Sequence, residues 1–163
     1  MGLDMYLYAD NYVSRTTNER VGDYKFATNP AFENVLATLN ATHLVNDDDF
    51  AGMSVSIPVG YWRKANAIHN WIVNECADGV DECQRIYVSK NKAEELVALC
   101  KQVIADPSLA NDLLPTASGF FFGSTDIDEY YINDLKHTVS VFEKVLKASE
   151  RGEVDSVIYQ ASW

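Results

Sequence analysis

Alternating apolar and polar positions predict a strand near each end of the sequence. In "GLDMYLYADNYV", Leu3, Met5 and Leu7 alternate with polar or aromatic residues. A period of two is typical of a strand with one buried face. The segment "EVDSVIYQASW" alternates in the same way. Because both segments have one apolar face, we expect strands at residues 3–9 and 156–162 to share a sheet.

Helical spacing of apolar residues predicts four helices between these strands. Asn29 and Pro30 have the residue types of an N-cap and a first helical position, and the apolar stripe behind them continues to His43. Ser89 is the expected cap of the third helix, and Gly152 follows the end of the fourth. The predicted helices cover residues 29–44, 60–77, 89–105 and a segment that begins between 125 and 128.

Turn residues separate these elements. "RTTNERVGDYKF" predicts a loop or a hairpin that returns through Tyr24 and Phe26, and "RIYV" predicts a short strand. Residues 45–60, "VNDDDFAGMSVSIPVG", have the composition of an internal linker, too short to separate two domains. The sequence therefore predicts one α+β domain over residues 1–163, with about four helices packed on a small sheet that includes both terminal strands.

The charge balance narrows the classes of partner. The chain of 163 residues has 24 acidic and 13 basic side chains, a net charge of −11, and 47% of its residues are hydrophobic. This hydrophobic content is typical of a globular protein. Net negative charge opposes binding to nucleic acid and to anionic lipid, since both need cationic partners. The acidity favours solubility, and competition with nucleic acid for a basic protein is the alternative interpretation.

Cysteine usage and the N-terminal sequence favour the cytoplasm. Three cysteines form no disulfide framework, and Cys100 on the apolar stripe of the third helix is expected to be buried. No basic stretch followed by an apolar stretch is visible at the N-terminus, and no apolar run approaches the roughly 20 residues that span a bilayer. We therefore expect a cytoplasmic protein that does not bind membranes.

The segment "SGFFFGSTDIDEYY", residues 118–131, is the first candidate site. Gly123 lets the backbone approach a ligand closely, and free N–H groups at the start of the following helix attract anions. Thr116 adds a hydroxyl, and the phenylalanines offer stacking surface. The alternative is a buried aromatic turn with an ordinary cap, because the acidic residues of the segment repel phosphate. The candidate ligand-binding residues here are Ser118, Phe120, Phe122, Ser124 and Thr125.

The segment "YWRKANAIHNW" is the second candidate site. Arg63 has a planar donor fork that suits phosphate or carboxylate, and Lys64 adds a second positive charge. His69 lies near the centre of the predicted apolar arc, as a hydrogen-bonding group at a pocket floor or as a core histidine with a backbone partner. Asn70 belongs to the polar stripe of this predicted helix. Asp4, Tyr6 and Trp163 are candidates to complete the same pocket.

Metal chemistry and nucleophilic catalysis have little support. Neither C-x-x-C nor H-E-x-x-H occurs, and "DIDE" lacks the glycine and terminal glutamate of a calcium loop. No G-x-S-x-G or catalytic cysteine signature is present. The sequence predicts neither a cofactor nor a metal.

Four segments resemble a family of small uncharacterised proteins from bacteriophages and bacterial genomes. They are "GLDMYLY", "YWRKANAIHNWIV", "LLPTASGFFFGSTDIDEYYINDL" and "YQASW", and the resemblance extends from residue 2 to residue 163. The family carries no biochemical role to transfer. The resemblance implies an accessory protein that acts in the host cytoplasm, in takeover of the host or in evasion of its defences.

Three hypotheses follow for function. The first is a non-catalytic protein that binds a small anionic ligand, with a nucleotide as the expected ligand, and so sequesters an immune signal. The second is an acidic inhibitor that binds a host protein. The third is a hydrolase that uses His69 with Asp4 or Asp128.

Overall fold

The computed structural model describes residues 2–46 and 52–163. Its main sheet contains β1 (Asp4–Ser14), β4 (Gly52–Arg63), β5 (Ile86–Tyr87) and β6 (Ser156–Ser162), in the order β4-β1-β6-β5. β6 pairs antiparallel with both β1 and β5, and Leu7 lies opposite Tyr159. The predicted pairing of the two terminal strands is confirmed.

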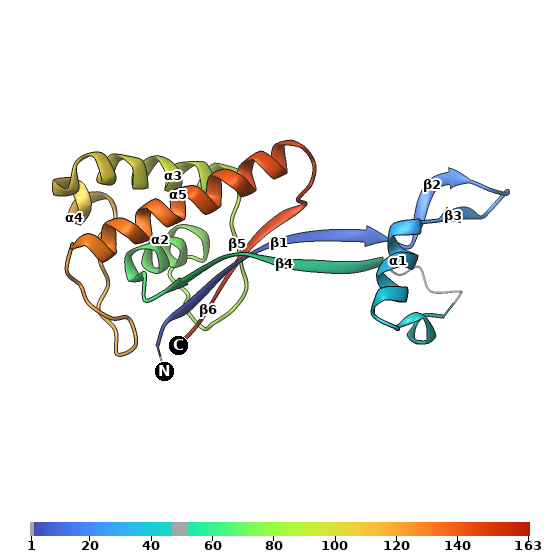
Figure 1. Cartoon of the computed structure of the whole chain (residues 1–163), viewed down its shortest axis with the longest axis horizontal. Coiled ribbons are helices and arrows are strands. Elements are labelled where there is room, and N and C mark those ends of the chain that lie inside the picture. The colour runs from blue at the N-terminus through green and yellow to red at the C-terminus, as the bar shows by residue number, and fades with distance from the viewer. Residues whose placement is uncertain (1, 47–51) are drawn as a thin grey trace. The chain divides into compact units, whose positions relative to one another are not determined.

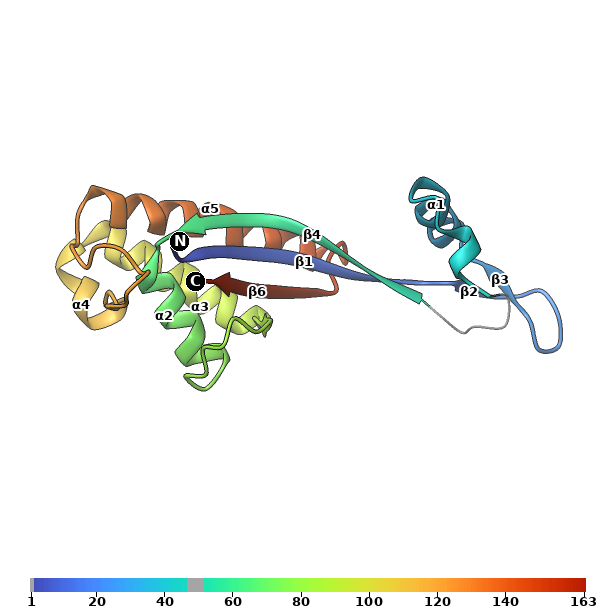
Figure 2. The same ribbon diagram turned by 90° about the horizontal axis from the view of Figure 1, so that it is seen from below.

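Helices gather on one face of this sheet (Figures 1 and 2). They are α2 (Asn66–Cys76), α3 (Lys90–Ala105), the short α4 (Ala110–Leu113) and α5 (Glu129–Glu150), with a 3-10 turn at Pro107–Leu109. Ser89 caps α3 by accepting a hydrogen bond from the Lys92 amide, as predicted. The fold is α+β, as the sequence predicts, and no helix among the described residues is long and apolar enough to cross a membrane.

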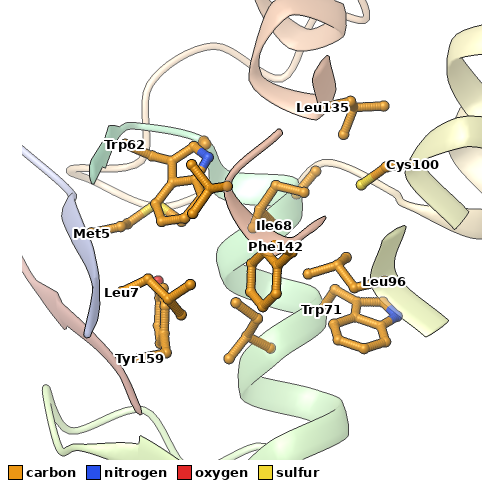
Figure 3. Packing of buried hydrophobic residues seen from close by; sticks show 14 of the residues in the cluster. Met5, Leu7, Trp62, Ile68, Trp71, Leu96, Cys100, Leu135, Phe142 and Tyr159 are labelled. Atoms are coloured by element: carbon orange, nitrogen blue, oxygen red, sulfur yellow. The ribbon is translucent and has the colours of Figure 1, made fainter. Parts of the chain in front are cut away.

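The core lies between the helices and the inner face of the sheet. Met5 and Leu7 of β1 are fully buried, as is Leu3 just before this strand, which confirms the alternation in the N-terminal segment. Figure 3 shows Met5 and Leu7 on the side of the core that faces side chains from α2, α3 and α5. Cys100 is 0% exposed, and burial raises the pKa of its thiol to about 12. The predicted burial of this cysteine is confirmed, and the raised pKa leaves the thiol protonated and unreactive at neutral pH.

Chain packing divides the molecule into two compact units, Met1–Asp10 with Ser56–Trp163 and Asn11–Val55. The smaller unit contains β2 (Thr16–Arg20), β3 (Phe26–Thr28), α1 (Pro30–Thr38) and a 3-10 turn at Thr42–Leu44. β2 and β3 pair antiparallel, so a hairpin forms as predicted. Asn29 caps α1 through a 3.0 Å hydrogen bond from the Ala31 amide to Oδ1.

Three element boundaries differ from the prediction. Residues 60–63, predicted as the start of the second helix, form the end of β4, and the helix starts only at Asn66. The predicted linker at residues 45–60 contains the greater part of β4, and its residues 47–51 lie outside the described residues. α1 ends at Thr38, so His43 falls in the 3-10 turn instead of on the helix.

The physical reason for the β4 error is a period of two hidden by turn residues. Ile57 and Val59 alternate with serine and proline but lie on the exposed face, whereas Gly60 and Trp62 lie on the opposite face and are buried. Pro58 and Gly60 are typical of loops, yet proline is also tolerated at the edge of a sheet, which is where β4 lies.

A candidate ligand cavity at two helix N-termini

A cavity of about 260 Å³ lies where β4 turns into α2 and where the loop after α4 enters α5. The two predicted candidate segments thus meet at one place, although residues 72–117 separate them in the sequence. The lining residues are Arg63, Lys64, Ala65, Asn66, Ala67, Ile68, Thr116, Ser124, Asp126, Asp128, Tyr130, Tyr131, Asp134 and Leu135.

One part of the lining is basic. Arg63 and Lys64 are exposed, and neither makes an ion pair with an acidic side chain among the described residues. Lys64 has a φ of 63°, and its amide donates to the Leu3 carbonyl at 2.8 Å. The backbone of the turn is therefore held by the first strand, while both cationic groups stay available to a ligand.

The N-terminus of α2 adds positive potential to this basic part. Its N-cap position is Ala65, which has no side chain to accept a hydrogen bond, and no acidic residue occupies the first turn. Ala67 and Ile68, in that first turn, line the cavity. Uncapped N–H groups and the helix dipole together attract a negative group.

The other part of the lining is acidic, but two of its three carboxylates already have partners. Asp128 caps α5 by accepting a hydrogen bond from the Tyr131 amide at 3.0 Å. Asp126 accepts from the Ser124 hydroxyl at 2.7 Å. Asp134 is different, because within the described residues no hydrogen bond or ion pair to its carboxylate is recorded.

The environment of Asp134 raises its pKa to about 6 from an ordinary 3.8. Desolvation by burial is the main cause, the charge of Asp128 also raises the pKa, and His137 lowers it. Arg63 and Lys64 come from the turn between β4 and α2, whereas Asp134 comes from α5, so different elements bring positive and negative groups to one cavity.

Asn66 fixes the loop that closes the cavity. Its side chain is 3% exposed and makes three hydrogen bonds with the loop backbone. The amide nitrogen donates to the carbonyls of Phe122 and Ser124 at 3.1 and 2.8 Å, and Oδ1 accepts from the Ala117 amide at 3.1 Å. One buried residue at the start of α2 thus holds residues 117–124 against the helix.

Gly123 lets the loop backbone pack closely against the Lys64 side chain, and its backbone conformation favours glycine. Its φ is +87°, and a Cβ atom there would lie 3.1 Å from both Cβ and Cδ of Lys64. The backbone freedom predicted for this position is therefore used, and the Lys64 side chain packs where a larger residue would stand.

The phenylalanine turn does not line the cavity. Phe120 is 95% exposed, and Ser118 is also exposed and outside the lining. Phe122 packs partly buried against the core, with its ring edge-on to His69 at 5.1 Å between centroids. Ser124 lines the cavity, whereas Thr125 contributes its carbonyl as acceptor for the Thr116 hydroxyl at 3.0 Å.

His69 lies in the core and not in the cavity lining. Its Nε2 donates to the Asp81 carboxylate at 3.0 Å, and in that tautomer Nδ1 accepts from the Tyr159 hydroxyl at 2.7 Å. Asp81 also accepts from the Trp163 indole at 3.3 Å. His69 is thus the fully bonded core histidine of the alternative interpretation, although its partners are side chains and not a backbone carbonyl.

The other predicted residues have partners away from the cavity. Asp4 accepts a hydrogen bond from the Tyr61 hydroxyl at 2.5 Å, on the sheet face opposite the helices. Tyr6 packs against the Tyr61 ring at 5.2 Å between centroids. Asn70 accepts from the Asn74 amide at 3.1 Å. The structure therefore does not bring His69 together with Asp4 or Asp128.

Sequence reasoning missed Asp134, Tyr130 and the structural role of Asn66. Asp134 lies among the polar positions of its helix, and the sequence does not distinguish it there from a solvent-exposed aspartate.

No group of three or more metal-ligating side chains occurs among residues 2–46 and 52–163. No protein-family model matches the chain, and neither a curated protein nor a solved structure matches it. The resemblance to phage proteins consequently stays a prediction from sequence motifs.

Proposed function

We propose that this protein is a non-catalytic binding protein and that the cavity holds a small anionic ligand, with a mononucleotide as the ligand class. One observation carries the proposal. Arg63, Lys64 and the uncapped N-terminus of α2 face the same cavity, and the two cations have no ion-pair partner among the described residues.

The chemistry of the basic part suits a phosphate group. A guanidinium can form two parallel hydrogen bonds with phosphate oxygens, and an ammonium adds a mobile point charge. The amides at the start of α2 add donors of fixed direction. The hydroxyls of Ser124 and Thr116 also line the cavity, but they already donate to the Asp126 carboxylate and the Thr125 carbonyl. The donors for a phosphate are therefore those of Arg63, Lys64 and the start of α2.

The remaining lining suits the rest of a nucleotide. Ile68, Leu135 and the ring of Tyr130 supply apolar and aromatic surface beside the polar groups. A volume of about 260 Å³ favours a compact ligand over a dinucleotide or a polymer. The overall charge of −11 opposes long nucleic acids, whereas a single phosphate needs only a local positive site.

The biological role is part of the same proposal. The resemblance to phage accessory proteins suggests that the protein sequesters a nucleotide signal of host defence in the host cytoplasm. Sequestration requires affinity and abundance, and no turnover. It is therefore compatible with a cavity in which neither His69 nor a nucleophilic cysteine is present in the lining.

An acidic inhibitor of a host protein is the second candidate, favoured by the open face of the sheet. Tyr6, Tyr8 and Tyr61 cluster there, with Tyr6 5.2 Å from Tyr61 and 6.2 Å from Tyr8 between ring centroids. The Arg85 guanidinium lies 5.5 Å from the Tyr8 ring centre. Aromatic side chains are frequent at protein interfaces, and net negative charge favours a basic partner.

Calorimetric titration with AMP, GMP, CMP and UMP tests the proposal. Wild type should bind at least one of them, and Arg63→Ala should weaken that binding by about 30-fold or more, since loss of a charge-assisted contact costs on the order of 2 kcal/mol or more. Arg151→Ala is the matched control, because Arg151 follows the far end of α5 and lies outside the lining. The proposal would be overturned if wild type bound none of the four nucleotides, or if Arg63→Ala and Arg151→Ala bound them with equal affinity.

A further inference from the structure

Asp134 is the one acidic group of the lining without a recorded partner in the described part of the chain. It projects from α5 two turns beyond the cap, and its half-buried position desolvates the carboxylate. No buried side-chain oxygen or nitrogen among the described residues lacks a hydrogen-bond partner, so the Asp134 oxygens are accessible from the cavity. Both oxygens are therefore able to accept hydrogen bonds from a ligand in the cavity.

No charged group among the described residues around Asp134 donates a hydrogen bond to its carboxylate, so a ligand is left to do so. On the same helix, His137 donates through Nε2 to the Tyr61 carbonyl at 3.0 Å, so this N–H does not bond to Asp134. From the preceding loop, Asp126 and Asp128 add only negative charge. From the β4–α2 turn, Arg63 and Lys64 line the same cavity but make no ion pair with Asp134.

Two adjacent N–H donors satisfy a carboxylate best, because each oxygen then receives one hydrogen bond in parallel geometry. The Watson–Crick edge of guanine offers such a pair, N1–H beside the 2-amino group. A guanidinium group offers the same pair. Hypoxanthine keeps only N1–H, and adenine places an acceptor at N1 beside its amino donor.

We infer that the ligand is bipolar, with its anionic group at Arg63 and Lys64 and a pair of adjacent N–H donors at Asp134, and that a guanine mononucleotide is its source. This inference rests on the proposed function, since it identifies the nucleotide that the same cavity selects. Asp134 is then a specificity-determining residue that contacts the base, while the basic pair supplies affinity common to all mononucleotides.

Competitive calorimetry with GMP, IMP, AMP and free L-arginine tests the inference on the full-length protein. We expect GMP to bind about 10-fold or more tightly than IMP or AMP, because each hydrogen bond to a charged group contributes about 1.5–3 kcal/mol. Asp134→Asn keeps the shape but presents one acceptor and one donor to the base. It should remove the preference for GMP and leave affinity for AMP within about 3-fold, because hydrogen bonds of uncharged pairs differ little in strength.

Asp112→Asn is the control, because it removes the same charge from α4 outside the lining, and thermal melts show that each variant is folded. Equal binding of GMP, IMP and AMP by wild type would overturn the inference and leave the proposed function intact. Binding of L-arginine that depends on Asp134, without any preference for GMP, would assign the donor pair to a guanidinium ligand and reject guanine. Failure of wild type to bind every nucleotide would reject the proposed function itself.

Discussion

Two helices begin at the same cavity, and their N-termini are built in opposite ways. α5 starts with Asp128 as a side-chain cap and Glu129 in its first turn, so the sequence itself neutralises the positive end of the helix. α2 starts at Ala65 without a side-chain cap, and Arg63 and Lys64 precede it. α5 needs no ligand at its N-terminus, whereas α2 concentrates unsatisfied donors and positive charge.

The difference separates a structural helix start from a candidate binding site. A missing cap costs about 1 kcal/mol, and two neighbouring cations add repulsion to the same end of the helix. Binding sites commonly contain such locally unfavourable arrangements, because stability and function select different residues.

The largest effect is expected for Asn66→Ala. The substitution removes three hydrogen bonds and leaves the Ala117 amide and the carbonyls of Phe122 and Ser124 without their partner. The free energy of unfolding should fall by on the order of 3 kcal/mol, since orphaned buried groups are costly. Hydrogen exchange should show faster exchange at residues 117–124. Unchanged protection of this loop would contradict the account of how the cavity is closed.

Gly123→Val should have the next largest effect, through backbone strain and contact with Lys64. A side chain in the left-handed region costs about 1–2 kcal/mol, and a β-branched one costs more. Gly152→Val is the control for the backbone alone, since Gly152 has a φ of +71° and open space around its Cβ position. Chemical denaturation should show a larger loss for Gly123→Val. Equal losses would mean that the contact with Lys64 contributes nothing.

The sequence predicted the fold better than it predicted the site. β1 and β6 were predictable because Leu3, Met5 and Leu7 report one buried face by simple alternation. The strand β4 was missed because Pro58 and Gly60 interrupt an otherwise regular alternation. Such a strand is stabilised by its neighbour β1 in the sheet, and that neighbour is not visible in a local window.

The site was predicted in part, for an equally physical reason. Arg63, Lys64 and Ser124 were identified from their residue types and do line the cavity. His69 was misplaced, because its position depends on Tyr159 and Asp81, which lie far apart in the sequence. Burial of a single helical aspartate is set by the loop and the sheet that pack around it, so local sequence does not report the raised pKa of Asp134.

Two substitutions at Asp128 should separate the effect of its helix-capping hydrogen bond from the effect of its negative charge. Asp128→Ala should cost about 1 kcal/mol of stability, because the Tyr131 amide loses its acceptor. Asp128→Asn keeps an acceptor and should stay within about 0.5 kcal/mol of wild type. Removing the charge should also lower the pKa of Asp134, which Asp128 raises. NMR titration of the Asp134 carboxyl in Asp128→Asn measures this change. A pKa of Asp134 that rose or stayed the same would contradict the predicted effect of the Asp128 charge.

The smallest effect is expected for the stability of Asp134→Asn. The folded pKa of about 6 lies above the ordinary 3.8, so the folded state binds more protons between these values and stability falls as pH rises through this window. Above it the ionised carboxylate costs a constant amount. Asp134→Asn should therefore be more stable than wild type at pH 8, by on the order of 1 kcal/mol or less after allowance for solvent screening. Melts at pH 4 and pH 8 should show a gain only at the higher pH, and a loss at pH 8 would contradict it.

An NMR titration with inorganic phosphate most directly tests the contrast between the two helix ends. Phosphate is small enough to report the anion site without any contribution from a base. The account predicts saturable amide shifts at residues 63–68, with the largest at Ala67 and Ile68, and much smaller shifts at residues 129–132 of α5. Shifts of equal size at both helix ends, or none at residues 63–68 at any phosphate concentration, would contradict it.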